Sequence, residues 1–184
     1  MVSIIDLLPN VSYKELDQAT CGFSPSNLIG SICFGFLCKG ALDHEERLVI
    51  KVLNLQHKGA SKNFMSKCNA LQNIQHRNLV KILTCCSIMD YSGNQFKALV
   101  FEFMKNGILD IWLHPGIDNE KQASNLSLLQ RPNVVIDVAS IIDYLHNHSA
   151  QLIIHYDLKL SNILLDNDTI THVSNFVLAR LLNY

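Results

Sequence analysis

A polar loop between apolar segments, at 153–166, constrains the fold of this chain more than any other stretch. It places Asp157, Lys159 and Asn162 at the spacing D-x-K-x-x-N, after an apolar pair and before an apolar triplet. Such flanks predict a loop that is anchored on both sides, so that three polar side chains emerge close together. A surface loop between two strands that carries these residues by chance is the alternative.

The composition limits the classes of protein to which the chain can belong. Its 184 residues are 48% hydrophobic and 17% charged, which predicts a folded chain rather than a disordered one. A formal net charge of −1 gives the whole chain no attraction to nucleic acid or anionic lipid. The start does not resemble a signal peptide, and no apolar run reaches the roughly 18 residues that a membrane span needs. We therefore expect a soluble, cytoplasmic chain with no nucleic-acid partner.

The cysteines fit that expectation. They lie at positions 21, 33, 38, 68, 85 and 86, and no two of them form a C-x-x-C pair. We interpret them as small buried apolar residues or free thiols rather than as a disulfide framework.

The first hundred residues predict a five-stranded antiparallel sheet. Ser12 and Glu15 have the spacing of a capping box, which predicts a short helix that ends before Gly22. A further helix is predicted after Ser61, which is a plausible N-cap. The extended segments are predicted at 28–40, 48–53, 79–89 and 96–101, the first of them broken by glycines into two strands.

A different pattern begins at residues 102–107, which predict a hinge. A short helix follows at 108–114, and the capping-box residues Ser127 and Gln130 open a long one. Because proline lacks a backbone donor, the regular part of this helix is predicted to start near Pro132. Its apolar stripe is predicted to consist of Val135, Val138, Ile142 and Leu145.

This order of elements resembles the two-lobed, α+β fold of protein kinases, and the loop at 153–166 resembles their catalytic loop, H-R-D-x-K-x-x-N. More narrowly, the chain is similar to the cytoplasmic domain of plant leucine-rich-repeat receptor-like serine/threonine kinases. The segments that carry this similarity are 12–16, 19–20, 22–24, 27–30, 76–80 and 143–146. The resemblance implies a juxtamembrane-like segment at 1–26, an N-lobe at 27–101, a hinge at 102–107 and a partial, mainly helical C-lobe at 108–184.

The resemblance also implies a site. In this family the loop aspartate accepts a hydroxyl proton, the lysine steadies the transferring phosphoryl group and the asparagine holds magnesium. It thus implies Asp157, Lys159 and Asn162 as catalytic residues, with ATP and Mg as cofactors. Lys51 is implied as the ligand of the α- and β-phosphates, although a solvent-facing edge lysine is the alternative. The other implied nucleotide contacts are Ile29, Gly30, Gly35, Leu37, Glu102 and Met104.

Two positions near Lys51 depart from the family pattern. Ile32 replaces the central glycine of G-x-G-x-x-G, where a branched side chain narrows the phosphate loop. Lys67 stands where the family has the glutamate that pairs with Lys51. Two like charges about 4 Å apart repel by roughly 4 kcal/mol at an effective dielectric near 20, so the expected attraction becomes a repulsion.

Three further departures from the family pattern lie in the second half of the chain. Asn175 and Val177 replace the aspartate and glycine of D-F-G, so Asn175 offers magnesium a neutral oxygen in place of a carboxylate. Tyr156 replaces the arginine of the catalytic loop, a loss that occurs in active members of the family.

The sequence stops seven residues after Val177 (184 − 177), before the activation segment of the family. We therefore expect an uncovered apolar face on the helix at 135–145, and a chain that is unstable alone or needs a partner. Three hypotheses follow: an impaired pseudokinase fragment that binds nucleotide or a partner kinase or receptor, a residually active kinase with Asp157 as base, or a decayed fragment without function. Full-length relatives would lie at the cytoplasmic face of the plasma membrane.

Overall fold

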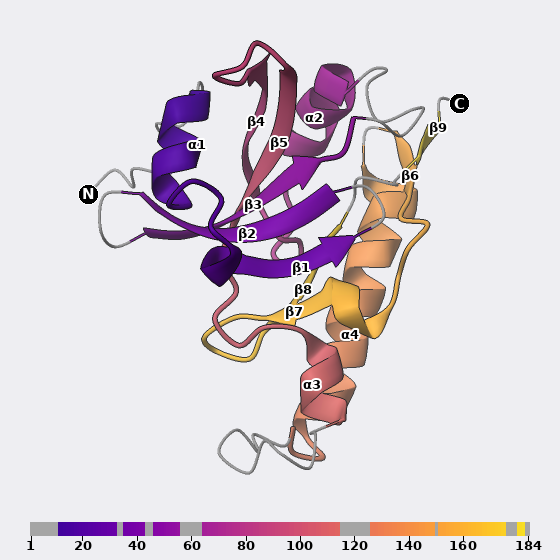
Figure 1. Ribbon diagram of the computed structural model, residues 1–184. Coiled ribbons are helices and arrows are strands. Elements are labelled where there is room, and N and C mark those ends of the chain that lie inside the picture. The colour runs from indigo at the N-terminus through magenta and orange to yellow at the C-terminus, as the bar shows by residue number, and fades with distance from the viewer. Residues whose placement is uncertain are drawn as a thin grey trace, which may run out of the picture. The chain divides into compact units, whose positions relative to one another are not determined.

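A computed structural model describes residues 11–32, 35–42, 46–55, 64–114, 126–149, 151–175 and 180–182 (Figure 1). The chain forms two compact units. The first comprises Met1–Asn73 and Lys81–Phe103, and the second comprises Ile74–Val80 and Met104–Tyr184. Each unit has a hydrophobic core of its own.

Helix α1 (Tyr13–Ala19) opens the first unit with the predicted capping box. The Ser12 hydroxyl accepts a hydrogen bond from the Glu15 backbone N–H at 3.3 Å, and the Glu15 carboxylate accepts one from the Ser12 backbone N–H at 2.7 Å. The helix buries Leu16 in the core, and the short 3₁₀ turn η2 (Pro25–Asn27) follows it.

Five antiparallel strands form the sheet of the first unit, as predicted (Figure 1). They are β1 (Leu28–Ile32), β2 (Gly35–Leu42), β3 (Glu46–Leu53), β4 (Ile82–Met89) and β5 (Gln95–Glu102). Their order across the sheet is β1-β2-β3-β5-β4, and each neighbouring pair is antiparallel.

The two faces of this sheet differ because neighbouring residues of a strand point in opposite directions. Ile50 and Ala98 lie on the face that shares a core with α1. Lys51 of β3 and Cys85 of β4 both pair with Leu99 of β5, so these three residues form one row across the other face.

Helix α2 (Phe64–Gln72) packs against β4. Its buried side chains are Phe64, Cys68 and Leu71, at the spacing of one helix face, as the sequence predicts. The predicted cap of this helix, Ser61, lies outside the described residues.

The second unit consists of short elements around one long helix. These are α3 (Leu109–Leu113), α4 (Gln130–Asp143) with its π-helical continuation η4 (Tyr144–His148), β6 (Leu152–Ile154), the 3₁₀ turn η5 (Leu160–Asn162), β7 (Ile163–Leu165), β8 (Thr171–Val173) and β9 (Arg180–Leu182). Strand β6 pairs with β9 and β7 with β8, both antiparallel. Nowhere in the described part of the chain is a helix both long enough and apolar enough to cross a membrane.

The core of the second unit gathers around β7. Leu109, Leu126, Val134 and Leu165 are buried there, and Trp112 packs against them. The indole N–H of Trp112 donates a hydrogen bond to a backbone carbonyl at 2.8 Å, which fixes the ring beside this core.

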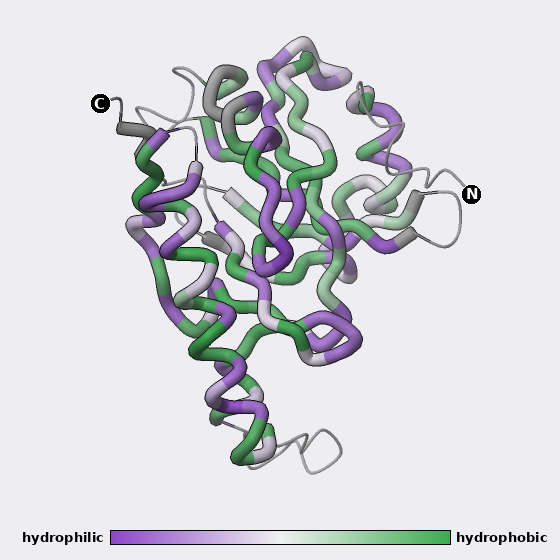
Figure 2. The backbone as a smooth tube through the Cα atoms, turned by 180° about the vertical axis from the view of Figure 1, so that it is seen from behind, coloured by the Kyte–Doolittle hydropathy of each residue, from purple (hydrophilic) through white to green (hydrophobic). Residues whose placement is uncertain are grey.

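Helix α4 starts close to the predicted position. It starts at Gln130, two residues before the predicted start, because Pro132 falls in the first turn, where backbone N–H groups have no partner within the helix. Val135 of the predicted apolar stripe is 68% exposed and lines an apolar groove together with Val138 and Ile142, whereas the neighbouring Val134 is buried in the core. Hydrophobic and hydrophilic positions alternate along this helix (Figure 2).

Candidate active site

The predicted polar loop lies between β6 and β7 in the second unit, and buried side chains hold both of its ends. Ile153 is 3% exposed before the loop, and Leu165 is fully buried after it. The backbone carbonyl of Asn162 accepts hydrogen bonds from the Ser174 backbone N–H at 2.8 Å and hydroxyl at 3.0 Å. The loop is therefore tied both to the core and to the segment that follows β8.

Both ring nitrogens of His155 form hydrogen bonds with the backbone of the loop or of the segment after β8. Its Nδ1 accepts a hydrogen bond from the Asp157 backbone N–H at 3.2 Å, so Nε2 carries the proton that it donates to the Ser174 carbonyl at 2.7 Å. Burial lowers the pKa of His155, against the opposing effects of Ser174 and Asp157. No role was predicted for this histidine, although its place at the start of the motif was the available signal.

The Asp157 carboxylate has three side-chain partners in the structure. Oδ2 accepts hydrogen bonds from the amides of Asn162 at 2.9 Å and Asn175 at 3.0 Å, and Oδ1 lies 3.2 Å from the Lys159 ammonium. Burial alone would raise the pKa of Asp157, but the hydrogen bonds from Asn162 and Lys159 outweigh it, so the pKa lies below its usual value. The carboxylate is ionised at neutral pH and already engaged.

Asn175 meets this carboxylate with its nitrogen. Its amide also points at Oδ1 of Asn162, 3.4 Å away, so one NH₂ group faces two acceptor oxygens. The orientation of Asn162 fits the same network, because its own NH₂ donates to Asp157 and leaves its oxygen toward Asn175. Asn175 has a positive φ of 68°, a conformation that asparagine tolerates better than most residues.

This donor set does not fit a magnesium ion. Magnesium binds oxygen ligands, usually including one or two carboxylates, in a near-octahedral shell. Here Oδ2 of Asp157 and Oδ1 of Asn162, the oxygens that would have to face the ion, are both approached by the NH₂ group of Asn175. No group of three or more histidine, cysteine, aspartate or glutamate side chains that could hold a metal occurs among the described residues.

In the first unit, the residues implied for nucleotide binding lie on four neighbouring strands, β1, β2, β3 and β5. Lys51 of β3 pairs with Leu37 of β2, which pairs with Gly30 of β1. Lys51 is only 4% exposed, so it is not the solvent-facing edge lysine that the sequence left open. Ile29, beside Gly30, is 45% exposed.

The two glycines implied as nucleotide contacts, Gly30 of β1 and Gly35 of β2, have different surroundings. A Cβ on Gly35 would lie 1.8 Å from the backbone oxygen of Val52, and Gly35 has a φ of +142°. A Cβ on Gly30 would have no atom within 4 Å. Gly35 is therefore required by strand packing, whereas Gly30 leaves open space that a ligand can approach.

The two implied hinge contacts belong to different units. The Glu102 carboxylate accepts a hydrogen bond from the Lys81 backbone N–H at 2.6 Å, within the first unit. Met104, in the second unit, is 8% exposed, and its carbonyl accepts a hydrogen bond from the Gly107 N–H at 3.2 Å.

Of the four departures from the family pattern other than Asn175, the structure describes only the Tyr156 side chain. Tyr156 is 55% exposed with a φ of 64°, so its ring stands at the surface of the loop. Ile32 lies in β1 and Lys67 in α2, but their side chains lie outside the described set, as does the whole of Val177.

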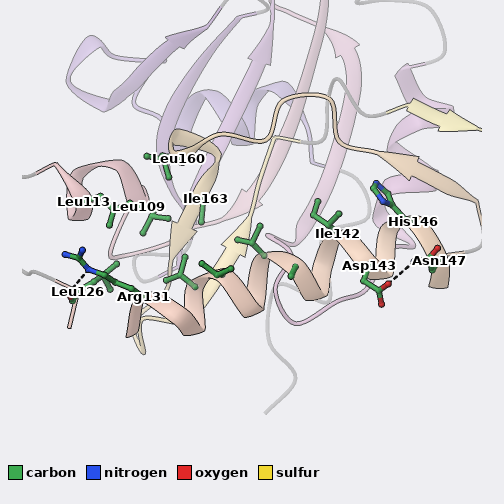
Figure 3. A pocket seen from close by; sticks show the side chains of 14 residues that line it. Leu109, Leu113, Leu126, Arg131, Ile142, Asp143, His146, Asn147, Leu160 and Ile163 are labelled. Atoms are coloured by element: carbon green, nitrogen blue, oxygen red, sulfur yellow. Dashed lines mark hydrogen bonds between the residues drawn. The ribbon is translucent and has the colours of Figure 1, made fainter. Parts of the chain in front are cut away.

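An apolar groove of about 670 Å³ runs along α3 and α4 in the second unit (Figure 3). Leu109, Val135 and Ile142 line it, and Leu160 and Ile163 approach from the end of the loop. Figure 3 shows Arg131 near one end and Asp143 with His146 near the other. An exposed apolar face on this helix was expected from the sequence.

Comparison with known proteins decides the family. Residues 24–184 match the sequence profile of the family described as protein tyrosine and serine/threonine kinase. The chain belongs to the protein kinase family. Three plant relatives are similar along nearly the whole chain: the probable LRR receptor-like serine/threonine-protein kinase At3g47570 of Arabidopsis thaliana at 54% identity, LRR receptor-like serine/threonine-protein kinase EFR of the same species at 51%, and receptor kinase-like protein Xa21 of Oryza sativa subsp. japonica at 47%.

Coverage differs strongly between the chain and these relatives. The matches span 94% to 95% of this chain but only 17% of each relative. Two solved structures share the fold: the apo GRMZM2G135359 pseudokinase (TM-score 0.73, 22% identity, 96% of this chain and 61% of that one) and the pseudokinase DRIK1 (TM-score 0.74, 23% identity, 91% and 62%). This similarity confirms the predicted kinase-like architecture.

Proposed function

We propose that this chain is a kinase-family domain with impaired phosphoryl transfer, which binds ATP weakly and without dependence on magnesium and acts by binding a partner kinase or receptor. One observation supports this most strongly: the Asn175 amide donates hydrogen bonds where the family implies a metal-binding carboxylate. The site lies on the cytoplasmic side in this proposal, as it does for the kinase domains of receptor-like kinases.

Hydrogen bonding around Asp157 opposes metal entry. A divalent cation at this cluster would have to displace the Asn175 N–H from Asp157 and turn the amide. Hydrogen bonds to charged groups contribute about 1.5–3 kcal/mol each, and the substitution also removes one negative charge from the site. Both effects weaken magnesium binding.

The composition of α2 supports the same conclusion. The helix reads FMSKCNALQ, so it contains no acidic residue that could pair with the buried Lys51. Lys67 occupies the position at which the family has glutamate. A lysine there cannot hold Lys51 in the geometry that phosphate transfer needs.

Nucleotide binding rests on the strands of the first unit. The open space over Gly30 admits phosphate groups close to the backbone, and Lys51 supplies positive charge on β3. Ile32 replaces the central glycine of the family's phosphate loop, so we expect weak affinity.

The decisive experiment compares the full chain with Asn175→Asp. Without magnesium, ATP should raise the Tm of the wild type slightly, and magnesium should not change this shift. Asn175→Asp should gain at least tenfold in ATP affinity when magnesium is added, as measured by calorimetry. Asn167→Asp is the matched control, because it adds the same charge at an exposed position of the β7–β8 turn. A wild type whose ATP affinity rises tenfold with magnesium contradicts the proposal.

A residually active kinase is the second candidate, and the loop geometry favours it. Asp157 is ionised and lies 3.2 Å from Lys159, so a carboxylate and an ammonium suited to a base and a phosphoryl clamp stand together. Radiolabelled phosphate transfer that is lost in Asp157→Ala would establish this activity. An aggregated chain that shows no nucleotide shift would instead indicate a decayed fragment.

A further inference from the structure

Two cysteines from different elements meet in the first unit. Cys68 lies in the middle of the buried face of α2 and is 2% exposed, whereas Cys85 on β4 is partly exposed. Helix α2 packs against β4, Cys68 lies on the buried face of that helix, and Cys85 lies in the sheet row of Leu99, close enough that each thiol changes the pKa of the other. They are therefore neighbours in space although 17 residues (85 − 68) separate them in the sequence.

Cys85 and Cys86 lie on opposite faces of the sheet, because neighbouring side chains of a strand alternate between the two faces. Cys85 is in register with Leu99, whereas Cys86 is in register with Ala98, a core residue of the opposite, α1-facing side of the sheet. The Cys86 thiol donates a hydrogen bond to the Ala98 carbonyl, with the sulfur 3.7 Å from the oxygen. Cys86 is therefore adjacent to Cys85 in the sequence but belongs to the core on the α1 side of the sheet.

The pKa values of the two thiols shift in opposite directions. The hydrogen bond from Cys85 lowers the pKa of Cys68, burial opposes this, and the positive charge of Lys97 lowers it further. Lys97 is buried, and its ammonium lies 5.6 Å from the ring centre of Phe64, one helical turn before Cys68. The same hydrogen bond and burial raise the pKa of Cys85. One sulfur is therefore favoured as the thiolate nucleophile, and the other stays protonated.

We propose that Cys68 and Cys85 are a peroxide-sensitive thiol pair that closes a disulfide between α2 and β4. The Cys68 thiolate attacks one oxygen of hydrogen peroxide, the O–O bond breaks, and a sulfenic acid forms as hydroxide leaves and is protonated to water. The sulfur of Cys85 then attacks the Cys68 sulfur, the S–O bond breaks, and the departing hydroxide takes the Cys85 proton to give a second water. Overall, two thiols and one peroxide become one disulfide and two waters.

The disulfide would fix α2, the helix that carries position 67, against the sheet. Partial exposure of Cys85 gives a molecule as small as peroxide a route to the pair. This inference does not depend on the proposed function, because it concerns only the first unit and requires neither nucleotide nor metal.

Mass spectrometry tests the proposal on the full chain. The protein is reduced, desalted and treated with hydrogen peroxide; free thiols are then alkylated before proteolysis. We expect a peptide pair cross-linked through Cys68 and Cys85 that disappears on reduction. Cys86→Ser should keep this cross-link, while Cys68→Ser and Cys85→Ser should each reduce it at least tenfold.

Two results would overturn the proposal. One is full alkylation of Cys68 and Cys85 in the peroxide-treated wild type, which needs no variant and so stands even if a serine variant fails to fold. The other is a cross-link of Cys85 to Cys86 or to a second chain. A supporting measurement is the Tm, which peroxide should raise by roughly 5 °C in the wild type and in Cys86→Ser only, since a disulfide that closes a short loop restricts the unfolded state.

Discussion

The loop around Asp157 and the strands around Lys51 differ in what holds them together. In the loop, side chains bond to one another and to the backbone: His155, Asn162 and Asn175 all contact Asp157. In the strands, backbone packing dominates, because Gly35 lies too close to Val52 for any side chain. A substitution in the loop is therefore expected to change its side-chain hydrogen bonds. A substitution at a tightly packed position of the strands, such as Gly35, is expected to displace the backbone.

The largest effect is expected at Leu165, the buried residue that anchors the end of the loop in the core. Leu165→Ala removes a fully buried side chain from the core of the second unit, and such a cavity costs about 3 kcal/mol of unfolding free energy. Urea denaturation measures it. Leu158→Ala, at a position 47% exposed within the same loop, is the control and should change stability by less than about 0.5 kcal/mol. Equal losses in both variants would show that buried anchors do not hold the loop.

Two glycine substitutions test whether backbone packing determines the stability of the strands. Gly35→Ala forces a Cβ into the Val52 carbonyl and should cost about 2 kcal/mol or more, whereas Gly30→Ala meets no neighbour and should leave stability unchanged or raise it by about 0.5 kcal/mol. Thermal unfolding followed by circular dichroism compares the two. If both variants unfold at the same temperature, the close approach of β2 and β3 is not what requires glycine.

The smallest effect concerns pH. Burial would raise the pKa of Asp166, but hydrogen bonds from His172 and from the Ile170 and Asp168 backbone N–H groups lower it below its usual value. A carboxylate with a lowered pKa in the folded state stabilises the protein above its unfolded pKa, and this contribution is lost as pH falls through the folded pKa.

The wild type should therefore exceed Asp166→Asn in unfolding free energy by about 1 kcal/mol near neutral pH. The difference should shrink as the solution is acidified below about pH 4. Asp168→Asn is the control, because that side chain is exposed at the same turn. A difference that stays constant down to strongly acidic pH would exclude the carboxylate as its source.

Local patterns in the sequence predicted much of the fold. The Ser12 and Ser127 capping boxes depend only on residues three apart, and both form. The five strands follow from alternation and glycine breaks. The start of α4 was predicted only to within two residues, because the effect of Pro132 depends on which helical turn it occupies.

The candidate site was predictable in its residues but not in its bonding. The spacing of Asp157, Lys159 and Asn162 identified the cluster, and Asn175 was predicted to stand at the metal-binding position of the family. Sequence reasoning treated Asn175 as a neutral oxygen ligand, whereas its nitrogen faces Asp157, 18 residues away. The orientation of an amide follows from partners that only the folded chain brings together. The pairing of Cys68 with Cys85 was missed for the same reason.

Trp112 has a practical consequence for all of these measurements. It is the sole tryptophan of the chain, and its indole is fixed by a hydrogen bond beside the core of the second unit. Selectively excited indole emission therefore reports the melting of that unit alone, while far-ultraviolet circular dichroism records both. Diverging transitions from these two optical signals would reveal stepwise denaturation without the need for any label.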